Sequence, residues 1–458
     1  MAINQSTLTS DLRASVTGAV IEPSDPTYDQ ARAIKAGTID RRPAAIVRAT
    51  DATDVARVIT FARDAGLELA VRCGGHSTAG HGTTNGGILL DLSAMKGLDI
   101  DPVAKTAWAD AGLTAGEYSS RAVEHGLATG FGDTASVGIG GITTGGGIGY
   151  LVRKYGLTID NLLAAEVVTA AGELLRVDAE SHPDLFWAIR GGGGNFGVVT
   201  RFQYRLQEVP KVVGGMLIQP ATVDVIAGFI AAAEAASDEL STIANVMPCP
   251  PMPFVPEEYH GKQVVMSLIC WSSDEAEAQE ALAPIRALAE PIADMVRPIP
   301  YPEIYPPDDP DYHPVAVART MFIDRVDREV AQTILDTLGQ STAQMPVTQL
   351  RVLGGAMARI PDDATAFAHR SSRILVNLAA LYDPSDDPAP HIAWVEGFMA
   401  TLRQDDAGAY VNFLADEPAR IRAAYPGTTY ERLAEIKRRY DPTNLFRLNQ
   451  NIEPAAGR

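Results

Sequence analysis

The sequence predicts a two-domain α+β protein, and three observations favour this fold class. The chain has 458 residues, which is too long for one small hydrophobic core. Glycine is dense up to about residue 208 and becomes sparse after Val209-Pro210. Both parts mix strand-like runs with helical patterns, and Ala/Glu/Leu-rich helices dominate the second. We therefore expect one domain over residues 1–208, completed by residues 415–458, and a second over residues 209–414 with an antiparallel sheet covered by helices.

The first elements are a strand, a helix and a second strand. The apolar run Ala45-Ile46-Val47 predicts a strand, and Asp51 or the threonine two residues later can cap a helix that runs to about Ala65. Apolar residues recur at helical spacing within that segment. Leu67–Val71 then resumes an extended structure, and Gly87–Leu92 predicts the next strand.

The rest of the first domain alternates in the same way. Strands are predicted at Trp108–Ala111, Leu163–Thr169, Leu174–Val177 and Phe196–Leu206, a turn at Ala171–Glu173, and helices at Ala115–His125 and Asp184–Ile189. The second domain should contain helices Thr222–Ala236 and Asp274–Leu288, strands Val264–Ile269, Thr348–Leu353 and Ile374–Leu378, and a proline-rich loop Pro298–Pro314. A basic amphipathic helix opens the tail Tyr430–Pro454.

Charge and composition narrow the class of function. The net charge of −19 disfavours binding to nucleic acid or to an anionic membrane surface, because both would repel the protein. No apolar run approaches the roughly 18 residues of a membrane helix. The three cysteines share no metal-like spacing, and their odd number disfavours a disulfide framework. We expect a reduced, cytoplasmic protein without a metal site; its oligomeric state stays open between monomer and homodimer.

The segment Val71–His81 carries the strongest local signal. Gly74 and Gly75 allow the backbone to approach a ligand closely, and successive N–H groups there can form a nest for a diphosphate. His76 lies in the middle of this nest, and a neutral imidazole is a good nucleophile. Taken alone, the same pattern also fits a glycine turn with a hydrogen-bonded histidine.

A second glycine-rich segment follows at residues 130–149. Eight glycines fall within the eighteen positions 132–149, where average usage gives roughly one. The spacing at Gly138-Ile139-Gly140-Gly141 does not match a dinucleotide fingerprint, and no Gly-Lys-Ser/Thr of a P-loop is present. Such a loop can follow the face of a ligand without side chains in the way. Taken alone, it fits a structural or flexible segment at least as well.

Together these two segments resemble the flavin loops of the berberine-bridge-enzyme-like family of FAD-linked oxidases. The resemblance extends through residues 153–162 and 184–200 and returns at Tyr440–Asn451. It implies a two-part FAD-binding domain of the PCMH type, as in vanillyl-alcohol-oxidase-like flavoproteins, with FAD bound covalently through His76. By the same resemblance, the residues expected to contact FAD are Arg72, Cys73, Gly74, Gly75, His76, Ser77, Thr78, Gly80, His81, Thr134, Ser136, Val137, Gly140, Gly141, Thr144, Gly147, Val199, Asn412, Asn449 and Asn451.

One position departs from the family pattern. Many relatives form a second flavin bond through a cysteine in the glycine loop, where this chain has Thr134, which cannot form a thioether. The expectation is a single covalent bond, as in the nicotine-oxidase-like bacterial branch, with Cys73 as a small packing residue. The small side chain of Val137, at the place where relatives gate oxygen, is compatible with an oxidase.

The resemblance also supplies catalytic candidates. Tyr410 matches the family's active-site tyrosine and is expected to be the base or an orienting hydrogen-bond partner; a structural strand tyrosine is the alternative. Plant relatives place a carboxylate near Ile374–Asn377, but this chain has none there, and Asn377 could only orient a substrate. The acidic run Asp308–His313 is predicted to be a solvated loop rather than a metal site or lid.

The predicted function is an FAD-dependent oxidase that takes a hydride from a small molecule with a hydroxyl or amine and passes electrons to molecular oxygen, giving H2O2. Two alternatives stay open: a dehydrogenase that uses another electron acceptor, and a flavin-binding protein without turnover. A NAD-dependent Rossmann enzyme is disfavoured, because neither glycine loop has the required spacing.

Overall fold

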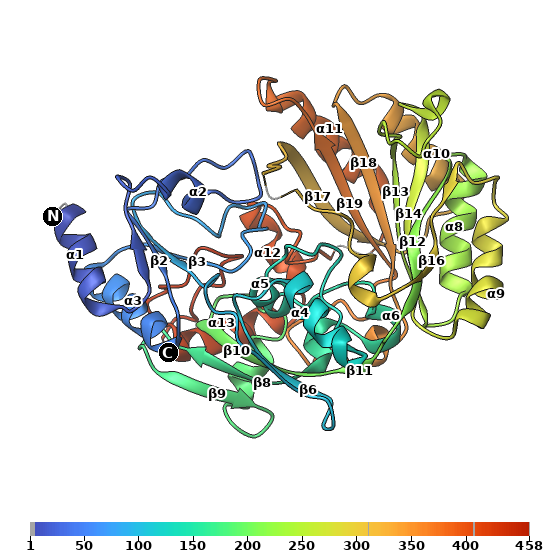
Figure 1. Ribbon diagram of the computed structural model, residues 1–458. Coiled ribbons are helices and arrows are strands. Elements are labelled where there is room, and N and C mark those ends of the chain that lie inside the picture. The colour runs from blue at the N-terminus through green and yellow to red at the C-terminus, as the bar shows by residue number, and fades with distance from the viewer. Residues whose placement is uncertain (1–4, 310, 406–407, 458) are drawn as a thin grey trace.

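The computed structural model describes residues 5–309, 311–405 and 408–457, and it shows two halves that meet along a broad face (Figure 1). The chain begins in the half at the left of Figure 1, crosses into the half at the right, and returns to the left at its C-terminal end. In the described part of the chain, no helix has both the length and the apolar character needed to span a lipid bilayer.

The N-terminal half starts with a small mixed sheet. Its strands are β1 (Ala19–Ile21), β2 (Ala45–Arg48), β3 (Leu69–Arg72) and β4 (Ile88–Asp91), in the order β1-β2-β4-β3. Strands β2, β4 and β3 are parallel, so the chain must cross over between β2 and β3, and α3 (Ala52–Ala65) makes that crossover. Asp51 caps α3, and Gly66 ends it with φ of 64°, a conformation that favours glycine.

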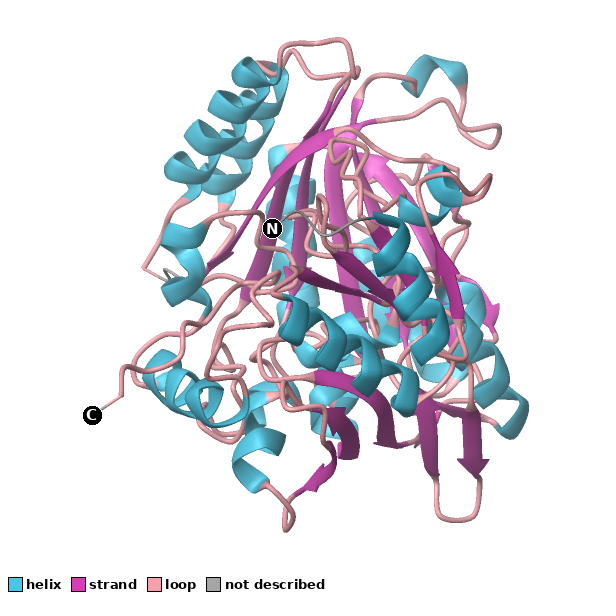
Figure 2. Cartoon of the chain, turned by 90° about the vertical axis from the view of Figure 1, so that its left-hand side faces the viewer, coloured by secondary structure: helices cyan, strands magenta, loops and turns pink. Residues whose placement is uncertain are grey.

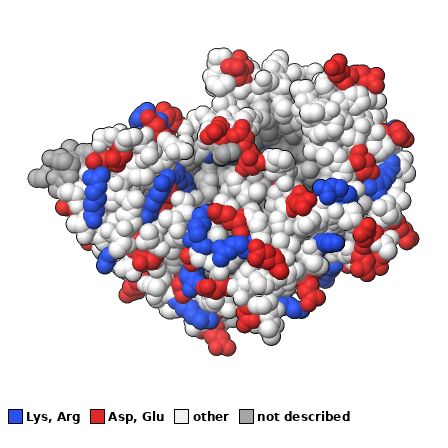
Figure 3. Space-filling view, viewed as in Figure 1, with Lys and Arg blue, Asp and Glu red and all other residues white. Residues whose placement is uncertain are grey.

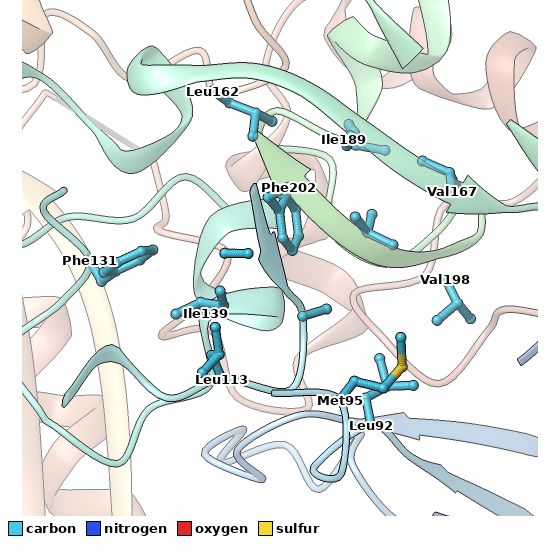
Figure 4. Packing of buried hydrophobic residues seen from close by; sticks show 14 of the residues in the cluster. Leu92, Met95, Leu113, Phe131, Ile139, Leu162, Val167, Ile189, Val198 and Phe202 are labelled. Atoms are coloured by element: carbon cyan, nitrogen blue, oxygen red, sulfur yellow. The ribbon is translucent and has the colours of Figure 1, made fainter. Parts of the chain in front are cut away.

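A five-stranded antiparallel sheet completes this half. Its order is β5-β6-β10-β8-β9, with the bounds Leu98–Asp101, Thr106–Asp110, Val198–Arg205, Leu162–Val168 and Leu174–Asp178. A two-stranded ribbon pairs β7 (Leu127–Ala128) with β11 (Gln207–Glu208). Helix α4 (Ala115–Ala122) begins at a capping box formed by Thr114 and Glu117. Figure 4 shows how Phe202 of β10 and Ile139 of the glycine loop lie in one apolar core.

The second half is built on an eight-stranded antiparallel sheet. The strand order is β15-β12-β14-β13-β18-β19-β17, with β16 added beside β12. The bounds are β12 (Val212–Pro220), β13 (Leu240–Pro248), β14 (Gln263–Trp271), β15 (Ala293–Asp294), β16 (Arg297–Ile299), β17 (Ala316–Ile323), β18 (Met345–Val352) and β19 (Ile374–Leu381). Figure 2 shows these long strands rising behind the N-terminal half.

Alternation along the strands decides which side of this sheet is covered. On β19, Ile374, Val376 and Leu378 pack into one apolar cluster with α8 (Val223–Ala235), α9 (Glu275–Arg286), α10 (Arg328–Gly339) and α11 (Pro388–Leu402). Side chains one residue out of step face the other way, because successive residues of a strand alternate. The side chain of Asn377 therefore lies on the side of the sheet that these helices do not cover.

Short helices make most of the connections. They are α1 (Gln5–Ser15), α2 (Tyr28–Arg32), α5 (Ile139–Thr144), α6 (Val152–Tyr155), α7 (Pro183–Ala188), α12 (Ile421–Ala424) and the 3-10 turns Val123–His125, Thr158–Asn161, Glu257–Tyr259, Tyr301–Ile304, Met357–Arg359 and Pro418–Arg420. The C-terminal helix α13 (Thr429–Tyr440) packs into the core of the N-terminal half. There Lys437 and Asp441 form a fully buried ion pair of 2.7 Å.

The structure confirms the predicted α+β class and the antiparallel sheet covered by helices. Several predicted elements are present, with ends that differ by a residue: the helix predicted at Thr222–Ala236 is α8, and the strand predicted at Leu163–Thr169 is β8. The sequence analysis did not predict the helices α1, α10 and α11 or the strands β12, β13 and β17. Residues 1–4, within the predicted first domain, and 406–407, within the second, lie outside the described residues.

Candidate active site

A cavity of about 410 Å³ lies where the two halves meet. Its volume falls within the range of small-molecule sites. The residues that line it are Val71–Thr78, His81, Gly82, Leu92, Gly132–Thr134, Val137, Gly138, Gly140–Ile142, Thr144, Ile148, Gly193, Gly194, Gly197–Val199, Ala318, Arg351, Asn377, Tyr410–Phe413, Asn449 and Gln450. Segments far apart in the sequence, including both glycine loops, the large sheet and the C-terminal tail, therefore meet in one cavity.

The turn that carries His76 follows directly from β3. Gly75 has φ of 70°, which lets the chain reverse, and the backbone N–H of Lys35 donates to the Gly75 carbonyl at 3.0 Å. The Nε2 atom of His76 lies 2.9 Å from the hydroxyl oxygen of Ser136. Burial lowers the pKa of His76 below its usual value, and the nearby charge of Lys35 lowers it further. The imidazole is accordingly neutral at neutral pH.

The two glycine loops touch each other backbone to backbone. A side chain on Gly74 would place its Cβ only 2.3 Å from the backbone nitrogen of Gly138. A Cβ on Gly140 would lie 2.4 Å from the sulfur of Cys73. The absence of side chains thus brings the loops together and leaves their backbones facing the cavity.

Two side chains of the cavity wall present polar atoms without a partner. Nε2 of His81 and Oδ1 of Asn449 are buried and have no hydrogen-bond partner among the described residues. Buried polar atoms are rarely left unsatisfied in proteins, so these atoms indicate a polar ligand. A side-chain-free glycine cradle with such atoms beside it fits a dinucleotide-sized cofactor with polar edges.

Two protein families match the chain at the segments that form this cavity. The FAD binding domain family matches residues 43–178, and the family described as berberine and berberine like matches residues 409–453. The (R)-6-hydroxynicotine oxidase of Paenarthrobacter nicotinovorans is 31% identical, over 96% of this chain and 97% of the relative. The chain belongs to the berberine-like family of FAD-linked oxidoreductases.

Other relatives agree with this assignment. The glucooligosaccharide oxidase of Sarocladium strictum is 28% identical over 91% of this chain and 86% of the relative. The crystal structure of 6-hydroxy-D-nicotine oxidase from Arthrobacter nicotinovorans matches with a TM-score of 0.85 and 28% identity, covering 99% of this chain and all of the other. The chain is therefore an FAD-binding oxidoreductase with the PCMH-type fold of this family, as its sequence predicted.

Most of the residues predicted to contact FAD line the cavity, but some do not. Those outside the lining are Gly80, Ser136, Gly147 and Asn451. Ser136 instead holds His76, and the backbone N–H of Gly147 donates to Tyr410. Gln450, which the sequence reading passed over, lines the cavity in place of Asn451.

Arg72 lines the cavity, but its guanidinium is already engaged. It forms a buried ion pair of 2.8 Å with Asp91 and donates to the carbonyl oxygen of Ala33 at 3.0 Å. Burial alone would raise the pKa of Asp91, but Arg72 and hydrogen bonds from Ser93 hold that pKa below its usual range. Arg72 therefore fixes the ends of β3 and β4, from which the His76 turn begins.

Tyr410 lies between the glycine loop and the large sheet. Its phenol oxygen accepts hydrogen bonds from the backbone N–H groups of Gly147 at 3.1 Å and Ile148 at 3.2 Å, and from the side-chain amide of Asn412 at 3.0 Å. Burial raises the pKa of Tyr410, although these three donors and the charge of Arg351 act in the opposite direction. Two of the three donors are backbone N–H groups of the glycine loop, and together the three donors hold the phenol in one position.

The sheet side of the cavity carries Asn377 and Arg351, and the sequence analysis did not predict Arg351 as a site residue. Arg351, only 4% exposed, donates to Asp133 of the glycine loop at 2.5 Å, and its guanidinium lies 4.9 Å from the ring centre of Phe413. Gln349 accepts from Arg351 at 2.9 Å. The sequence did contain a signal for this polar face. Gln349 and Arg351 alternate with apolar Leu350 and Val352 on a predicted strand.

Thr134 and Cys73 both line the cavity. The hydroxyl of Thr134 donates to Asp133 at 3.2 Å, within the glycine loop. Cys73 is a free cysteine that touches Gly140, and burial raises the pKa of its thiol to about 12. A thiol with that pKa stays protonated and unreactive at neutral pH.

The acidic loop is exposed, as the sequence predicted, but one of its carboxylates is engaged. Asp308, Asp309, Asp311 and Tyr312 are exposed residues, and Pro310 lies outside the described residues. Asp308, however, accepts a hydrogen bond from Ser136 and forms an ion pair of 2.9 Å with Lys35. No group of three or more His, Cys, Asp or Glu side chains that could hold a metal ion occurs in the described ranges.

The outer surface is mixed in charge. On the face of the molecule in Figure 3, basic side chains are interspersed with acidic ones, and the surface recedes between the two halves.

Proposed function

We propose that this protein is an oxidase that removes a hydride from a carbon bearing a hydroxyl or amine and delivers the electrons to molecular oxygen, producing H2O2. When bound, FAD supplies the hydride acceptor. The observation that carries the proposal is the cavity itself, in which the two glycine loops face Asn377 and Arg351 of the sheet with Tyr410 between them. The substrate is a small molecule, because the cavity is small.

The proposed attachment point of FAD is His76 alone. His76 is neutral and lines the cavity, which leaves its imidazole able to act as a nucleophile. Thr134 and the protonated thiol of Cys73 offer no second attachment point. Those residues predicted from the family pattern that line the cavity remain proposed contacts of FAD. The proposed division is a flavin domain of residues 1–208 and 415–458 and a substrate domain of residues 209–414.

On the substrate side we assign Tyr410 an orienting role. The phenol oxygen of Tyr410 accepts hydrogen bonds from three N–H donors. The hydroxyl proton of Tyr410 is therefore left to donate a hydrogen bond into the cavity. A raised pKa keeps that proton on the phenol at neutral pH, which disfavours the alternative role of Tyr410 as a resting base. Asn377, which lines the cavity from β19, would bind a polar group of the substrate.

Two measurements test attachment. Acid precipitation should leave the flavin on the protein, and peptide mass mapping should find one flavinylated peptide, which contains His76. The His76→Ala variant should still bind some FAD non-covalently, because the glycine loops remain. A flavin adduct on a cysteine, or complete release of FAD by acid, would contradict the proposal.

An oxidase and a dehydrogenase both take a hydride from the substrate, and they differ in the electron acceptor that reoxidises the flavin. Val137, a small residue, lines the cavity and leaves room for oxygen, which favours the oxidase. A panel of alcohols, sugars and cyclic amines should be screened for anaerobic bleaching of the flavin absorbance. Fast recovery in air with release of H2O2 supports the oxidase, whereas slow recovery supports a dehydrogenase with another acceptor. If no compound bleaches the flavin, the protein is a flavin-binding protein without turnover.

The three free cysteines also support placing the protein in a reducing compartment such as the cytoplasm.

A further inference from the structure

A chain of polar contacts reaches His76 from a distant part of the sequence. Nε2 of His76 lies 2.9 Å from the hydroxyl of Ser136, and that hydroxyl donates to one carboxylate oxygen of Asp308. The other carboxylate oxygen accepts from the ammonium group of Lys35 at 2.9 Å. Ser136 belongs to the glycine loop, whereas Asp308 belongs to the loop that connects the 3-10 turn Tyr301–Ile304 to β17.

Several contacts hold Asp308 in this place. The ammonium group of Lys35 also donates to the carbonyl oxygen of Asp309 at 2.9 Å. His313 lies with its Nδ1 atom 2.8 Å from the carbonyl oxygen of Ile34, and the N–H of Gly37 donates to the carbonyl of Pro314 at 2.9 Å. The loop is therefore held at Asp308 and at the residues that follow it by the segment that also supports the His76 turn.

The direction of each hydrogen bond follows from the charges. Burial alone would raise the pKa of Asp308, but hydrogen bonds from Lys35 and Ser136 hold that pKa below its usual range, so the carboxylate is ionised and can only accept. The single hydroxyl proton of Ser136 is thus committed to Asp308. The oxygen of Ser136 must then accept the remaining hydrogen bond, and its donor is the Nε2–H of neutral His76.

This arrangement fixes the tautomer of His76. With the ring proton on Nε2, which lies 2.9 Å from the hydroxyl oxygen of Ser136, the lone pair of the neutral ring lies on Nδ1. An imidazole nitrogen with a free lone pair is the nucleophilic one. The second nitrogen is already linked to a group that can receive its proton.

We propose that Asp308, acting through Ser136, is a positioning residue for the covalent attachment of FAD to Nδ1 of His76. The inference rests on the proposed attachment at His76. In the step, a C–H bond of the flavin 8-methyl group breaks and an Nδ1–C bond forms. One proton leaves the methyl carbon, and a second leaves Nε2 through Ser136 toward Asp308. The two electrons pass to the flavin ring and then to molecular oxygen, which takes up the two protons as H2O2.

Asp308 contributes in two ways. Before the bond forms, its charge orients the Ser136 hydroxyl and so keeps the Nε2–H tautomer of His76. As the bond forms, the ring becomes positive until Nε2 loses its proton, and the carboxylate offsets that charge. The same logic governs an Asp–His pair that orients the imidazole of a catalytic triad.

The test compares variants of the full-length protein for two separate quantities. Total bound FAD is measured from visible absorbance, and the rate of attachment is measured as acid-stable flavin formed after FAD is added in air. Asp308→Asn and Ser136→Ala should attach FAD slower by about 10²-fold, while total FAD binding stays near the wild-type level. Asp308→Glu, which keeps the charge, should recover much of the rate.

The matched control is Asp309→Asn, because Lys35 contacts Asp309 through its backbone carbonyl and not through its side chain. This variant should attach FAD at the wild-type rate. If Asp308→Asn does not fold, Ser136→Ala carries the test, since it leaves the Lys35 contact with Asp308 in place. Attachment at the wild-type rate in both Asp308→Asn and Ser136→Ala overturns the inference. Absence of acid-stable flavin in the wild type itself would instead show that the proposed attachment at His76 is wrong.

Discussion

One wall of the cavity is made by the backbone of two glycine loops, whereas the facing wall is made by side chains that stand on a sheet. The loop wall depends on what is absent, since a Cβ on Gly74 would meet the backbone of Gly138 at 2.3 Å. The sheet wall depends on which side chains alternate to that face, and it presents Asn377 and Arg351. The first wall fits one cofactor closely, and the second can be changed residue by residue without altering the backbone.

That difference separates cofactor binding from substrate choice. Backbone contacts cannot be changed by substitution without disturbing the fold, so the flavin side is expected to respond to mutation through stability and cofactor content. The sheet side should respond through substrate affinity and rate. Substitutions on the two walls should therefore differ in what they change and in how large the effect is.

Replacing Gly74 by alanine should abolish retention of FAD. The added methyl group meets a backbone atom rather than a flexible side chain, so one of the two loops must move, at a cost of about 3 kcal/mol or more. Flavin content and denaturant unfolding measure the effect. The control is Gly397→Ala in α11, where a Cβ has no atom within 4 Å and should stabilise the protein by about 0.5–1 kcal/mol. Full flavin content in Gly74→Ala would mean that the loops are not in tight contact.

The Tyr410→Phe variant should slow anaerobic flavin bleaching by about 10²-fold, because it removes the hydroxyl proton that orients the substrate. It also leaves the backbone N–H groups of Gly147 and Ile148 without their acceptor. Tyr425→Phe is the matched control, since the Tyr425 hydroxyl is buried with no partner among the described residues. An unchanged bleaching rate in Tyr410→Phe would make Tyr410 a structural residue.

Arg351→Gln should lower the free energy of unfolding by about 3 kcal/mol, because it leaves the Asp133 carboxylate, which is 24% exposed, without its partner. Arg359 pairs with Asp238 at 2.6 Å but is 64% exposed, so Arg359→Gln should change stability by no more than about 0.5 kcal/mol. Urea unfolding of both variants checks the contrast. Equal effects would show that the buried pair adds nothing beyond a surface pair.

The smallest effect is a pH dependence of stability that arises from His81. Burial lowers the pKa of His81 to about 4, below its usual value of about 6.5. The unfolded chain therefore binds a proton that the folded protein does not, and the free energy of unfolding falls as pH falls from about 6.5 to about 4. The loss is on the order of 2–3 kcal/mol. A His81→Gln variant should show a flatter profile over this range; identical profiles would exclude His81 as the source.

The loop wall could be predicted from sequence because its requirement is compositional. Eight glycines lie within positions 132–149 and two more precede His76, and the two segments together favour close approach of the backbone to a ligand. The sheet wall could not be predicted to the same degree. Asn377 was found only through the family pattern, and Arg351 was missed because a strand residue shows its face only once the neighbouring strands are in register.

Asp308 illustrates the same limit more sharply. A run of acidic residues between prolines has the composition of a solvated loop, and Asp308, Asp309 and Asp311 are indeed exposed residues. Nothing local in the sequence indicates that one of these carboxylates lies beside Ser136, 172 positions away. Contacts of that kind follow from tertiary packing alone.

The 3-10 turn Tyr301–Ile304 has a consequence for exchanging parts between relatives. Tyr301, Ile304 and Tyr305 come from the segment between two strands of the large sheet, yet they are buried in the apolar core of the flavin-binding half. A chimaera that replaced residues 209–414 as one block would also replace these core side chains. Recombination at the composition boundary should therefore fail unless the incoming segment carries aromatic residues that fill the same space, and workable crossover points lie on either side of this turn.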